Sequence, residues 1–211
     1  MARRRVAVLV SGRGSNMSAL IAAAAQPDHP AAIVLVLSNR AGAPALMLAS
    51  AAGIPAEAIP SEGVSKAVFE ARLQRRLEDA DIDLICLAGF MRVLSADFVQ
   101  RWHNRLINIH PSLLPAFPGL DTHARALAAG VRQHGCTVHF VRTAVDSGPI
   151  IAQSAVTVLP DDTAETLAQR VLAEEHRLYP QALALVAGGR AKVVGDRVLI
   201  DGVPVEPVTA G

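Results

Sequence analysis

Apolar residues gather along this chain in short continuous runs, and longer stretches with a helical repeat lie between them. Runs such as Val6–Val10 and Ile33–Leu37 are typical of strands that are buried on both faces of a parallel sheet. The longer stretches place apolar residues three to four positions apart, as in an amphipathic helix. In the clearest case, residues 65–79, the expected apolar stripe consists of Val68, Phe69, Leu73 and Leu77.

The pattern predicts an alternation of strands and helices over the whole chain. The expected strands cover residues 6–10, 33–37, 56–59, 83–88, 106–110, 135–141 and 150–158, and the expected helices cover 17–25, 44–52, 65–79, 95–102, 122–130 and 163–187. We therefore predict a single α/β domain over residues 1–211, with a Rossmann-like, doubly wound and mostly parallel sheet of about seven strands. Helices should cover both faces, and residues 192–200 should add a C-terminal hairpin.

The strand expected at residues 106–110 ends with two polar side chains. Pro111 and Pro115 cannot continue a central strand, so the strand must stop near His110. Because side chains alternate along a strand, Asn108 and His110 should point to the same face. An isolated Asn-x-His pair is more often a capped strand end than a catalytic site, so this pattern alone leaves both interpretations open.

A glycine-rich loop, Ser11–Asn16, separates the first expected strand from the first expected helix. Free N–H groups at a helix N-terminus form an anion site, and Ser15 and Asn16 can add side-chain donors. The loop fails as a dinucleotide-binding fingerprint because Met17 stands where a glycine is needed. We interpret it as a monophosphate cradle, although a plain tight turn fits the pattern equally well.

Composition excludes several classes of protein. Lys and Arg number 20 and Asp and Glu number 19, so the net charge of +1 gives no support for a nucleic-acid or membrane-surface partner. The apolar run after the basic start is too short for a signal peptide, and no stretch is long enough to span a membrane. Cys86 and Cys136 lack metal-ligand spacing, which fits a cytoplasmic protein without a metal. We expect a monomer or homodimer that acts on small molecules.

Six motifs together resemble the family of folate-dependent glycinamide ribonucleotide formyltransferases. They occur in the family's order and at its spacings over nearly the whole chain, which makes the resemblance specific. The motifs are Ser11–Asn16, Ala88–Leu94, Asn108–Pro115, His134–Phe140, Asp146–Pro149 and Glu175-His176.

The resemblance implies formyl transfer from 10-formyltetrahydrofolate to the amine of glycinamide ribonucleotide, in de novo purine biosynthesis and without a metal. Attack of the amine on the formyl carbon builds a tetrahedral oxyanion, which needs positioned hydrogen-bond donors. By resemblance, Asn108 lies beside the formyl group, His110 donates a proton, and Asp146 raises the pKa of His110. A carboxylate next to an imidazole favours the charged ring, which agrees with that role.

The resemblance also assigns the binding residues. The ribonucleotide is expected at Gly14, Ser15, Asn16 and Glu175, and Thr137 and His139 are expected to support the site. The folate is expected at Lys66, Met91, Arg92, Val93, Leu94, Asn108, Arg142, Thr143, Ala144, Val145 and Asp146. Residues 1–105 would thus form the phosphate and ribonucleotide half, and residues 106–211 the folate-binding and catalytic half. The chain departs from the family pattern at Lys66, where an arginine is frequent, and at Leu172 and Glu174, where glutamines occur.

Three other functions share part of this pattern. Methionyl-tRNA formyltransferases carry a similar loop but have an additional domain and a basic surface, whereas this chain is nearly neutral. A formyltetrahydrofolate deformylase would have no reason to keep a phosphate loop for an amine acceptor. A non-catalytic nucleotide-binding module would leave Asn108, His110 and Asp146 unexplained as a set. The sequence also marks Leu114-Pro115 and Gly148-Pro149 as places where a cis peptide bond can occur.

Overall fold

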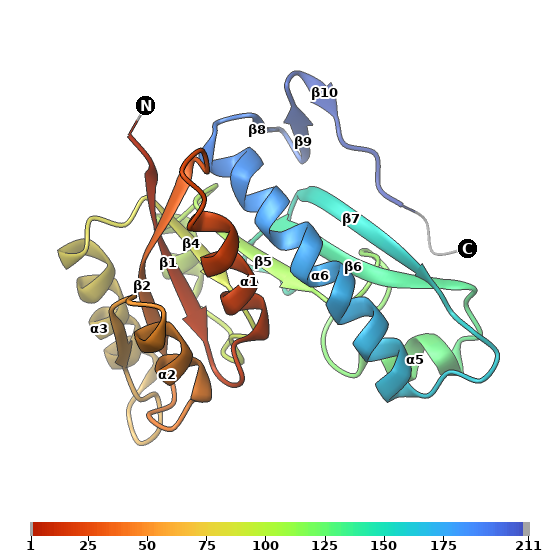
Figure 1. Cartoon of the computed structure of the whole chain (residues 1–211), viewed down its shortest axis with the longest axis horizontal. Coiled ribbons are helices and arrows are strands. Elements are labelled where there is room, and N and C mark those ends of the chain that lie inside the picture. The colour runs from red at the N-terminus through yellow and green to blue at the C-terminus, as the bar shows by residue number, and fades with distance from the viewer. Residues whose placement is uncertain (1, 209–211) are drawn as a thin grey trace. The chain divides into compact units, whose positions relative to one another are not determined.

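The computed structural model describes residues 2–208, and its elements alternate as expected (Figure 1). The strands are β1 (Arg4–Val10), β2 (Ala31–Ser38), β3 (Ala56–Ala58), β4 (Leu84–Leu87), β5 (Leu106–His110), β6 (Gln133–Phe140), β7 (Ile150–Thr157), β8 (Ala191–Val194), β9 (Arg197–Ile200) and β10 (Val203–Pro204). The helices are α1 (Ser15–Ala24), α2 (Pro44–Ala51), α3 (Lys66–Asp79), α4 (Ala96–Arg101), α5 (Thr122–Ala128) and α6 (Ala164–Ala187).

Seven strands form the main sheet in the order β3-β2-β1-β4-β5-β6-β7. The pairs β1–β2, β1–β4 and β2–β3 are parallel, whereas β6 and β7 pair antiparallel. Strands β8, β9 and β10 form a separate three-stranded sheet with antiparallel pairs. The predicted α/β class, the mostly parallel sheet of about seven strands and the C-terminal hairpin are confirmed.

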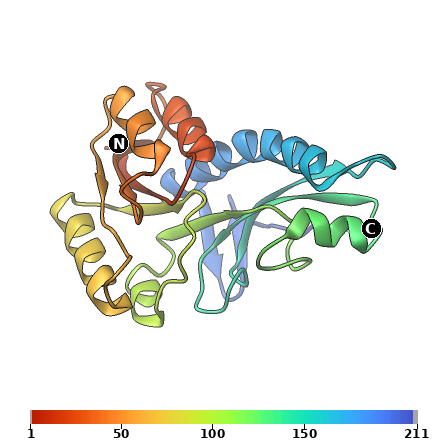
Figure 2. The same cartoon turned by 90° about the horizontal axis from the view of Figure 1, so that it is seen from below.

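The chain divides into two compact units, the first ending at Ile107 and the second starting at Asn108. In the first unit, every residue of Val6–Val10 is fully buried, as expected for a central parallel strand. Helices α1 and α2 lie on one face of its strands and α3 lies on the other (Figure 2). This arrangement of layers explains why the strand sequence shows no polar alternation.

Helix α3 follows the sequence prediction except at one residue. The Ser65 hydroxyl accepts a hydrogen bond from the Val68 N–H at 3.3 Å and caps the helix, as expected. Phe69, Leu73 and Leu77 are buried, but Val68 is 44% exposed and lies outside the apolar stripe. The buried position beside Phe69 belongs instead to Glu70, whose carboxylate accepts from the N–H of Ser95, the residue that caps α4.

The second unit is built on β6, β7 and the long helix α6, which packs on both strands. A capping box starts α6, because the Thr163 hydroxyl accepts from the Thr166 N–H while the Thr166 hydroxyl accepts from the Thr163 N–H. Helix α5 contacts α6, and β9 contacts β7. Within the described residues, no helix has both the length and the apolar character needed to cross a membrane.

Candidate active site

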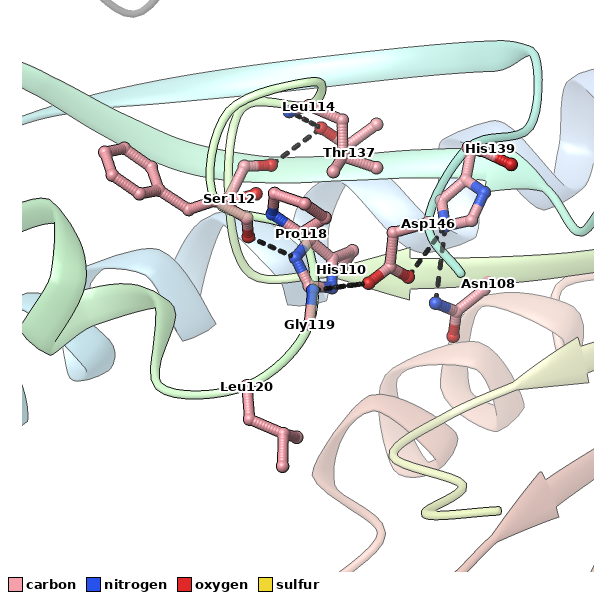
Figure 3. A network of polar contacts seen from close by, with 12 residues as sticks. Asn108, His110, Ser112, Leu114, Pro118, Gly119, Leu120, Thr137, His139 and Asp146 are labelled. Atoms are coloured by element: carbon pink, nitrogen blue, oxygen red, sulfur yellow. Dashed lines mark hydrogen bonds and ion pairs between the residues drawn. The ribbon is translucent and has the colours of Figure 1, made fainter. Parts of the chain in front are cut away.

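Strand β5 ends at His110, as the prolines after it predicted, and its polar side chains lie in the second unit. His110 is 5% exposed, and the Ser112 N–H donates to its carbonyl oxygen at 2.9 Å where the chain turns. Figure 3 shows Asn108 and His110 beside Asp146 and His139, which come from other segments of the same unit. The structure therefore brings the three predicted catalytic residues together.

The His110 ring lies between two hydrogen-bond acceptors. Its Nδ1 is 3.3 Å from Oδ2 of Asp146, and its Nε2 is 3.0 Å from the carbonyl oxygen of Phe117. A carbonyl only accepts, so Nε2 must carry a proton to form this bond. The neutral ring then has no N–H for Asp146, whereas the protonated ring donates to both acceptors.

The pKa of His110 depends on opposing effects of burial and of its neighbours. Burial lowers this pKa below its usual value of 6.5, and the Phe117 carbonyl and the Asp146 carboxylate, which both raise it, do not compensate. The charges of His139 and Arg125 lower the pKa further. The expected effect of Asp146 is present, and the pKa is still lowered because desolvation of the ring is the larger effect.

His139 connects Asn108 to Asp146. Its Nδ1–H donates to the Phe140 carbonyl at 3.0 Å, which leaves Nε2 to interact with both neighbours. Nε2 lies 3.4 Å from Nδ2 of Asn108 and 3.7 Å from Oδ1 of Asp146. A neutral His139 accepts from Asn108, and a protonated His139 donates to Asp146. His139 is thus a neighbour of two predicted catalytic residues.

Asp146 is held by backbone as well as by side chains. The Gly119 N–H donates to its Oδ2 at 2.9 Å. Burial raises the pKa of this carboxyl, but hydrogen bonds from His139 and Gly119 and the charge of His110 outweigh burial, so the pKa lies below its usual range. The carboxylate therefore stays charged at neutral pH.

The loop that carries Asp146 has a constrained backbone. Asp146 adopts a left-handed conformation with φ 51°, which aspartate tolerates better than most residues. Two residues later, a Cβ at Gly148 would lie 1.6 Å from the carbonyl oxygen of Phe140, so no side chain fits there. Three residues of this loop that were predicted to contact folate are exposed: Thr143, Ala144 and Val145. Arg142 is half-buried and donates to the Val141 carbonyl at 3.0 Å.

Thr137 fixes the loop that follows His110. Its hydroxyl donates to the Ser112 carbonyl at 2.7 Å and accepts from the Leu114 N–H at 3.0 Å (Figure 3). Gln153, which sequence reasoning missed, donates to the same hydroxyl and to the Leu114 carbonyl, both at 2.8 Å. The Leu114-Pro115 bond is cis, as considered from the sequence. Thr137 thus binds the backbone of the loop that follows His110, and its supporting role stays a prediction.

The glycine-rich loop belongs to the first unit. Gly14 has φ 82° and precedes α1, and its carbonyl accepts from the Ser18 N–H at 2.9 Å. A Cβ at Gly14 would lie 2.6 Å from the Cβ of Ala45 in α2. This glycine is therefore required by packing, which the sequence did not indicate. Ser15 and Asn16 lie in the first turn of α1. Their role in binding the ribonucleotide stays a prediction.

A buried hydroxyl joins the glycine-rich loop to the predicted folate segment of the same unit. The Met91 N–H donates to Oγ of Ser11 at 2.7 Å, and this hydroxyl donates to Oδ1 of Asn39 at 2.5 Å. Five of the predicted folate residues belong to this unit. Leu94 is buried, and the other four are exposed: Lys66, Met91, Arg92 and Val93. Glu70 accepts from the Ser95 N–H at 2.7 Å and anchors the far end of this segment.

Glu175 and Glu174 have different surroundings on α6. Glu175 is 6% exposed, and its charge is one reason why the pKa of the buried Cys136 thiol rises to about 12, after burial itself. Glu174 accepts a hydrogen bond from the Ser154 hydroxyl at 2.5 Å and pairs with Arg177. These two bonds lower the pKa of Glu174. Glu174, which stands where the family pattern can have a glutamine, thus binds Ser154 and Arg177. The carboxylate of Glu175 is buried.

Residues 2–208, which the structure describes, offer His, Cys, Asp and Glu side chains as potential metal ligands. No group of three or more His, Cys, Asp or Glu side chains in this part of the chain is arranged to hold a metal ion.

The family follows from comparison with known proteins. The profile of the formyl transferase family matches residues 4–183. The chain belongs to this family. The family resemblance inferred from the motifs, and with it the assignment as an enzyme that transfers formyl groups, is confirmed.

Similar proteins carry names that agree with this family. Phosphoribosylglycinamide formyltransferase of Escherichia coli is 39% identical over 203 residues, and the match covers 96% of each chain. The solved structure of phosphoribosylglycinamide formyltransferase from Coxiella burnetii is 45% identical and superposes with a TM-score of 0.91, covering 97% of this chain and 96% of that one. A trifunctional purine biosynthetic protein of Drosophila melanogaster is 53% identical over 195 residues. This match covers 90% of the chain but only 14% of that much longer relative.

The deformylase interpretation also has a structural counterpart within this formyl transferase fold. A formyltetrahydrofolate deformylase from Burkholderia mallei has a TM-score of 0.86 and 32% identity, covering 94% of this chain and 70% of that one. Its identity is lower than that of the Coxiella burnetii enzyme.

Proposed function

We propose that the protein transfers the formyl group from N10 of 10-formyltetrahydrofolate to the amine of glycinamide ribonucleotide, a step of purine biosynthesis. The amine nitrogen bonds to the formyl carbon, the bond from this carbon to N10 breaks, and a proton passes from the amine to N10. The names of the Escherichia coli and Coxiella burnetii relatives support this pair of substrates. Both relatives match this chain over almost their whole lengths.

The observation that carries the proposal is the contact of His110 with Asp146 beside Asn108. The amide of Asn108 and the ring of His110 are suited to donate to the oxyanion that forms on the formyl oxygen. The ring can also take up and release a proton, because imidazole titrates closer to neutral pH than other side chains and Asp146 opposes the lowering of its pKa by burial. Asp146 stabilises the protonated ring and so assists the proton transfer from the amine to N10, through water.

Catalysis under this proposal requires a change at Nε2 of His110. Nε2 donates to the Phe117 carbonyl, and the other ring nitrogen of His110, Nδ1, faces Asp146. A substrate oxygen is an acceptor of the same kind as the Phe117 carbonyl and must replace it to receive the Nε2 proton. Substrate binding is therefore expected to shift the backbone at Phe117, which has φ 53°.

The remaining assignments belong to the same proposal and come from the family resemblance. We assign ribonucleotide binding to Gly14, Ser15, Asn16 and Glu175. Folate binding is assigned to Lys66, the Met91–Leu94 segment and the Arg142–Asp146 loop. Residues 1–105 would then serve mainly the ribonucleotide, and residues 106–211 the folate and the chemistry.

The setting of the reaction is part of the proposal as well. The near-zero net charge and the two buried cysteines support a cytoplasmic protein that meets only small-molecule substrates. Either a monomer or a homodimer fits this function, and sedimentation velocity distinguishes them.

One assay tests the proposal against its alternatives. The purified protein is mixed with 10-formyltetrahydrofolate, and release of tetrahydrofolate is followed with and without glycinamide ribonucleotide. We expect release that depends on the ribonucleotide, together with formylated ribonucleotide in equal amount. Release at the same rate without the ribonucleotide, with free formate as product, would show a deformylase. Absence of turnover in folded protein that binds the ribonucleotide would favour a non-catalytic module.

A further inference from the structure

Arg125 of α5 holds the loop that touches both His110 and Asp146. One of its nitrogens, Nη1, donates to the carbonyl oxygens of Pro118 at 2.6 Å and Leu120 at 3.2 Å. Its guanidinium carbon also lies 5.7 Å from the centre of the Phe117 ring, in cation–π contact. Three residues of this loop, Phe117, Pro118 and Leu120, are therefore tied to this one side chain.

The two carbonyls flank the residue that binds Asp146. The Pro118 carbonyl and the Gly119 N–H belong to the same planar peptide group. Its oxygen accepts from Arg125, and its N–H donates to Oδ2 of Asp146 at 2.9 Å. That same Oδ2 faces Nδ1 of His110 at 3.3 Å. Arg125, the peptide, the carboxylate and the imidazole thus form one continuous chain of polar contacts.

The loop needs such an anchor because its backbone is unfavourable. Phe117, Gly119 and Asp121 all have positive φ angles, of 53°, 81° and 56°. Only glycine adopts this conformation without cost, so the loop depends on contacts outside its own backbone. On one side these contacts are His110 and Asp146, and on the other side they are those of Arg125.

We propose that Arg125 is a positioning residue for the reaction: by fixing the Pro118-Gly119 peptide, it aims the Gly119 N–H at Asp146 and so sets the carboxylate against His110. This inference rests on the proposed function for its effect on rate, but the link from Arg125 to Asp146 stands on the geometry alone. A carbonyl bound to a cation polarises its own peptide group, which strengthens the N–H as a donor.

Shape and charge make separable contributions at this position. A lysine keeps the positive charge but has a flexible point charge in place of the planar guanidinium, which bridges two carbonyls and stacks on Phe117. If Arg125 acted only through its charge, Arg125→Lys would restore activity. Positioning predicts that Arg125→Lys recovers only part of the loss seen in Arg125→Gln.

The rate test uses these two variants and a matched control. We expect kcat for formyl transfer to fall about 10-fold in Arg125→Gln and about 3-fold in Arg125→Lys, while KM for the ribonucleotide changes less than 2-fold. Arg132→Gln removes another exposed arginine of the second unit and should keep the wild-type kcat. Equal activity of wild type and Arg125→Gln would overturn the proposal.

A double variant tests whether Arg125 acts through Asp146. In the Asp146→Asn background, adding Arg125→Gln should change kcat less than 2-fold, because the carboxylate that it positions is already gone. Losses that multiply in the double variant would show that Arg125 stabilises the fold in general, and would overturn the proposal.

A third measurement does not depend on activity. Hydrogen exchange of the Gly119 N–H, followed by NMR in the full chain, should become at least 10-fold faster in Arg125→Gln and should stay close to wild type in Arg132→Gln. Unchanged protection in Arg125→Gln would refute the link. If the wild-type protein showed no formyl transfer, the proposed function would fail, but this measurement would still decide whether Arg125 positions the Gly119 N–H. If Arg125→Gln did not fold, Arg125→Lys would be measured in its place, and we expect faster exchange in it than in the wild type.

Discussion

Nδ1 of His110 lies 3.3 Å from Oδ2 of Asp146, and the two side chains are only 7% and 10% exposed. Water therefore screens this contact much less than it screens a surface ion pair. Burial disfavours a charged ring, and the carboxylate favours it, so the protonation of His110 depends on the balance of two large effects. Small changes at either residue should have large effects on proton transfer.

Replacing Asp146 with asparagine should leave the fold intact and lower kcat strongly. Asparagine tolerates the left-handed backbone at this position and keeps an acceptor for the Gly119 N–H, but it carries no charge. A positioned acid or base contributes roughly 100-fold to 10,000-fold to a rate, so we expect a loss in this range. Steady-state kinetics and circular dichroism check it. Asp81→Asn, at an exposed aspartate with φ 47°, is the control that should retain full activity.

The pKa of His110 should lie below 6.5 in the wild type and fall further in Asp146→Asn. The carboxylate is one of the groups that raise this pKa, so its removal leaves burial less opposed. Because the folded pKa is the lower one, stability that His110 contributes is present above pH 6.5 and is lost as the pH falls through the folded value. NMR titration of the His110 Cε1–H signal measures the pKa. A value above 6.5, or a rise in Asp146→Asn, would contradict the prediction.

Alanine at Gly14 should destabilise the protein, whereas alanine at Gly12 should not. A Cβ at Gly14 would lie 2.6 Å from Cβ of Ala45, on a backbone with φ 82°, while a Cβ at Gly12 meets nothing within 4 Å. We expect Gly14→Ala to lower the free energy of unfolding by about 1 to 3 kcal/mol, and Gly12→Ala to change it by less than about 0.5 kcal/mol. Urea unfolding compares the two. Equal stabilities would show that the α1–α2 contact adjusts to the extra carbon.

Valine at Thr137 should cost far more than serine. The buried hydroxyl binds the Ser112 carbonyl, the Leu114 N–H and the Gln153 side chain, and valine removes all three hydrogen bonds. An unsatisfied buried polar group costs about 1 to 3 kcal/mol, so Thr137→Val should lose at least about 2 kcal/mol of unfolding free energy. Thr137→Ser keeps the hydroxyl and should lose less than about 1.5 kcal/mol, the range seen for removal of one methyl group. Chemical denaturation of both variants provides the measurement.

The parts of the fold that were predictable depend on neighbours in sequence. Pro111 ends β5, the Ser65 hydroxyl caps α3, and the alternation of side chains places Asn108 and His110 together. Each of these follows from the geometry of one strand or one helix turn. The family resemblance extended this local information to Asp146, which lies 36 positions after His110.

The parts that were not predictable depend on contacts between distant residues or on burial. Nothing in the sequence indicates that the Phe117 carbonyl binds His110, or that Gln153 joins Thr137 to the Leu114 carbonyl. The net pKa of His110 depends on how deeply the ring is buried, which a motif does not report. The prediction that Val68 belongs to the buried stripe of α3 was wrong for a related reason. Glu70 is buried there and accepts from the Ser95 N–H, although hydrophobicity alone would place an apolar residue in a buried position.

The close approach of Gly148 to Phe140 has a consequence for genetics. Any side chain at Gly148 would overlap the Phe140 carbonyl and displace the loop that carries Asp146 two residues earlier. Random missense mutations at Gly148 should therefore cause the same loss of function as mutations of the Asp146 carboxylate. In a screen for loss of function, this glycine would be scored as essential although it provides no group for the chemistry.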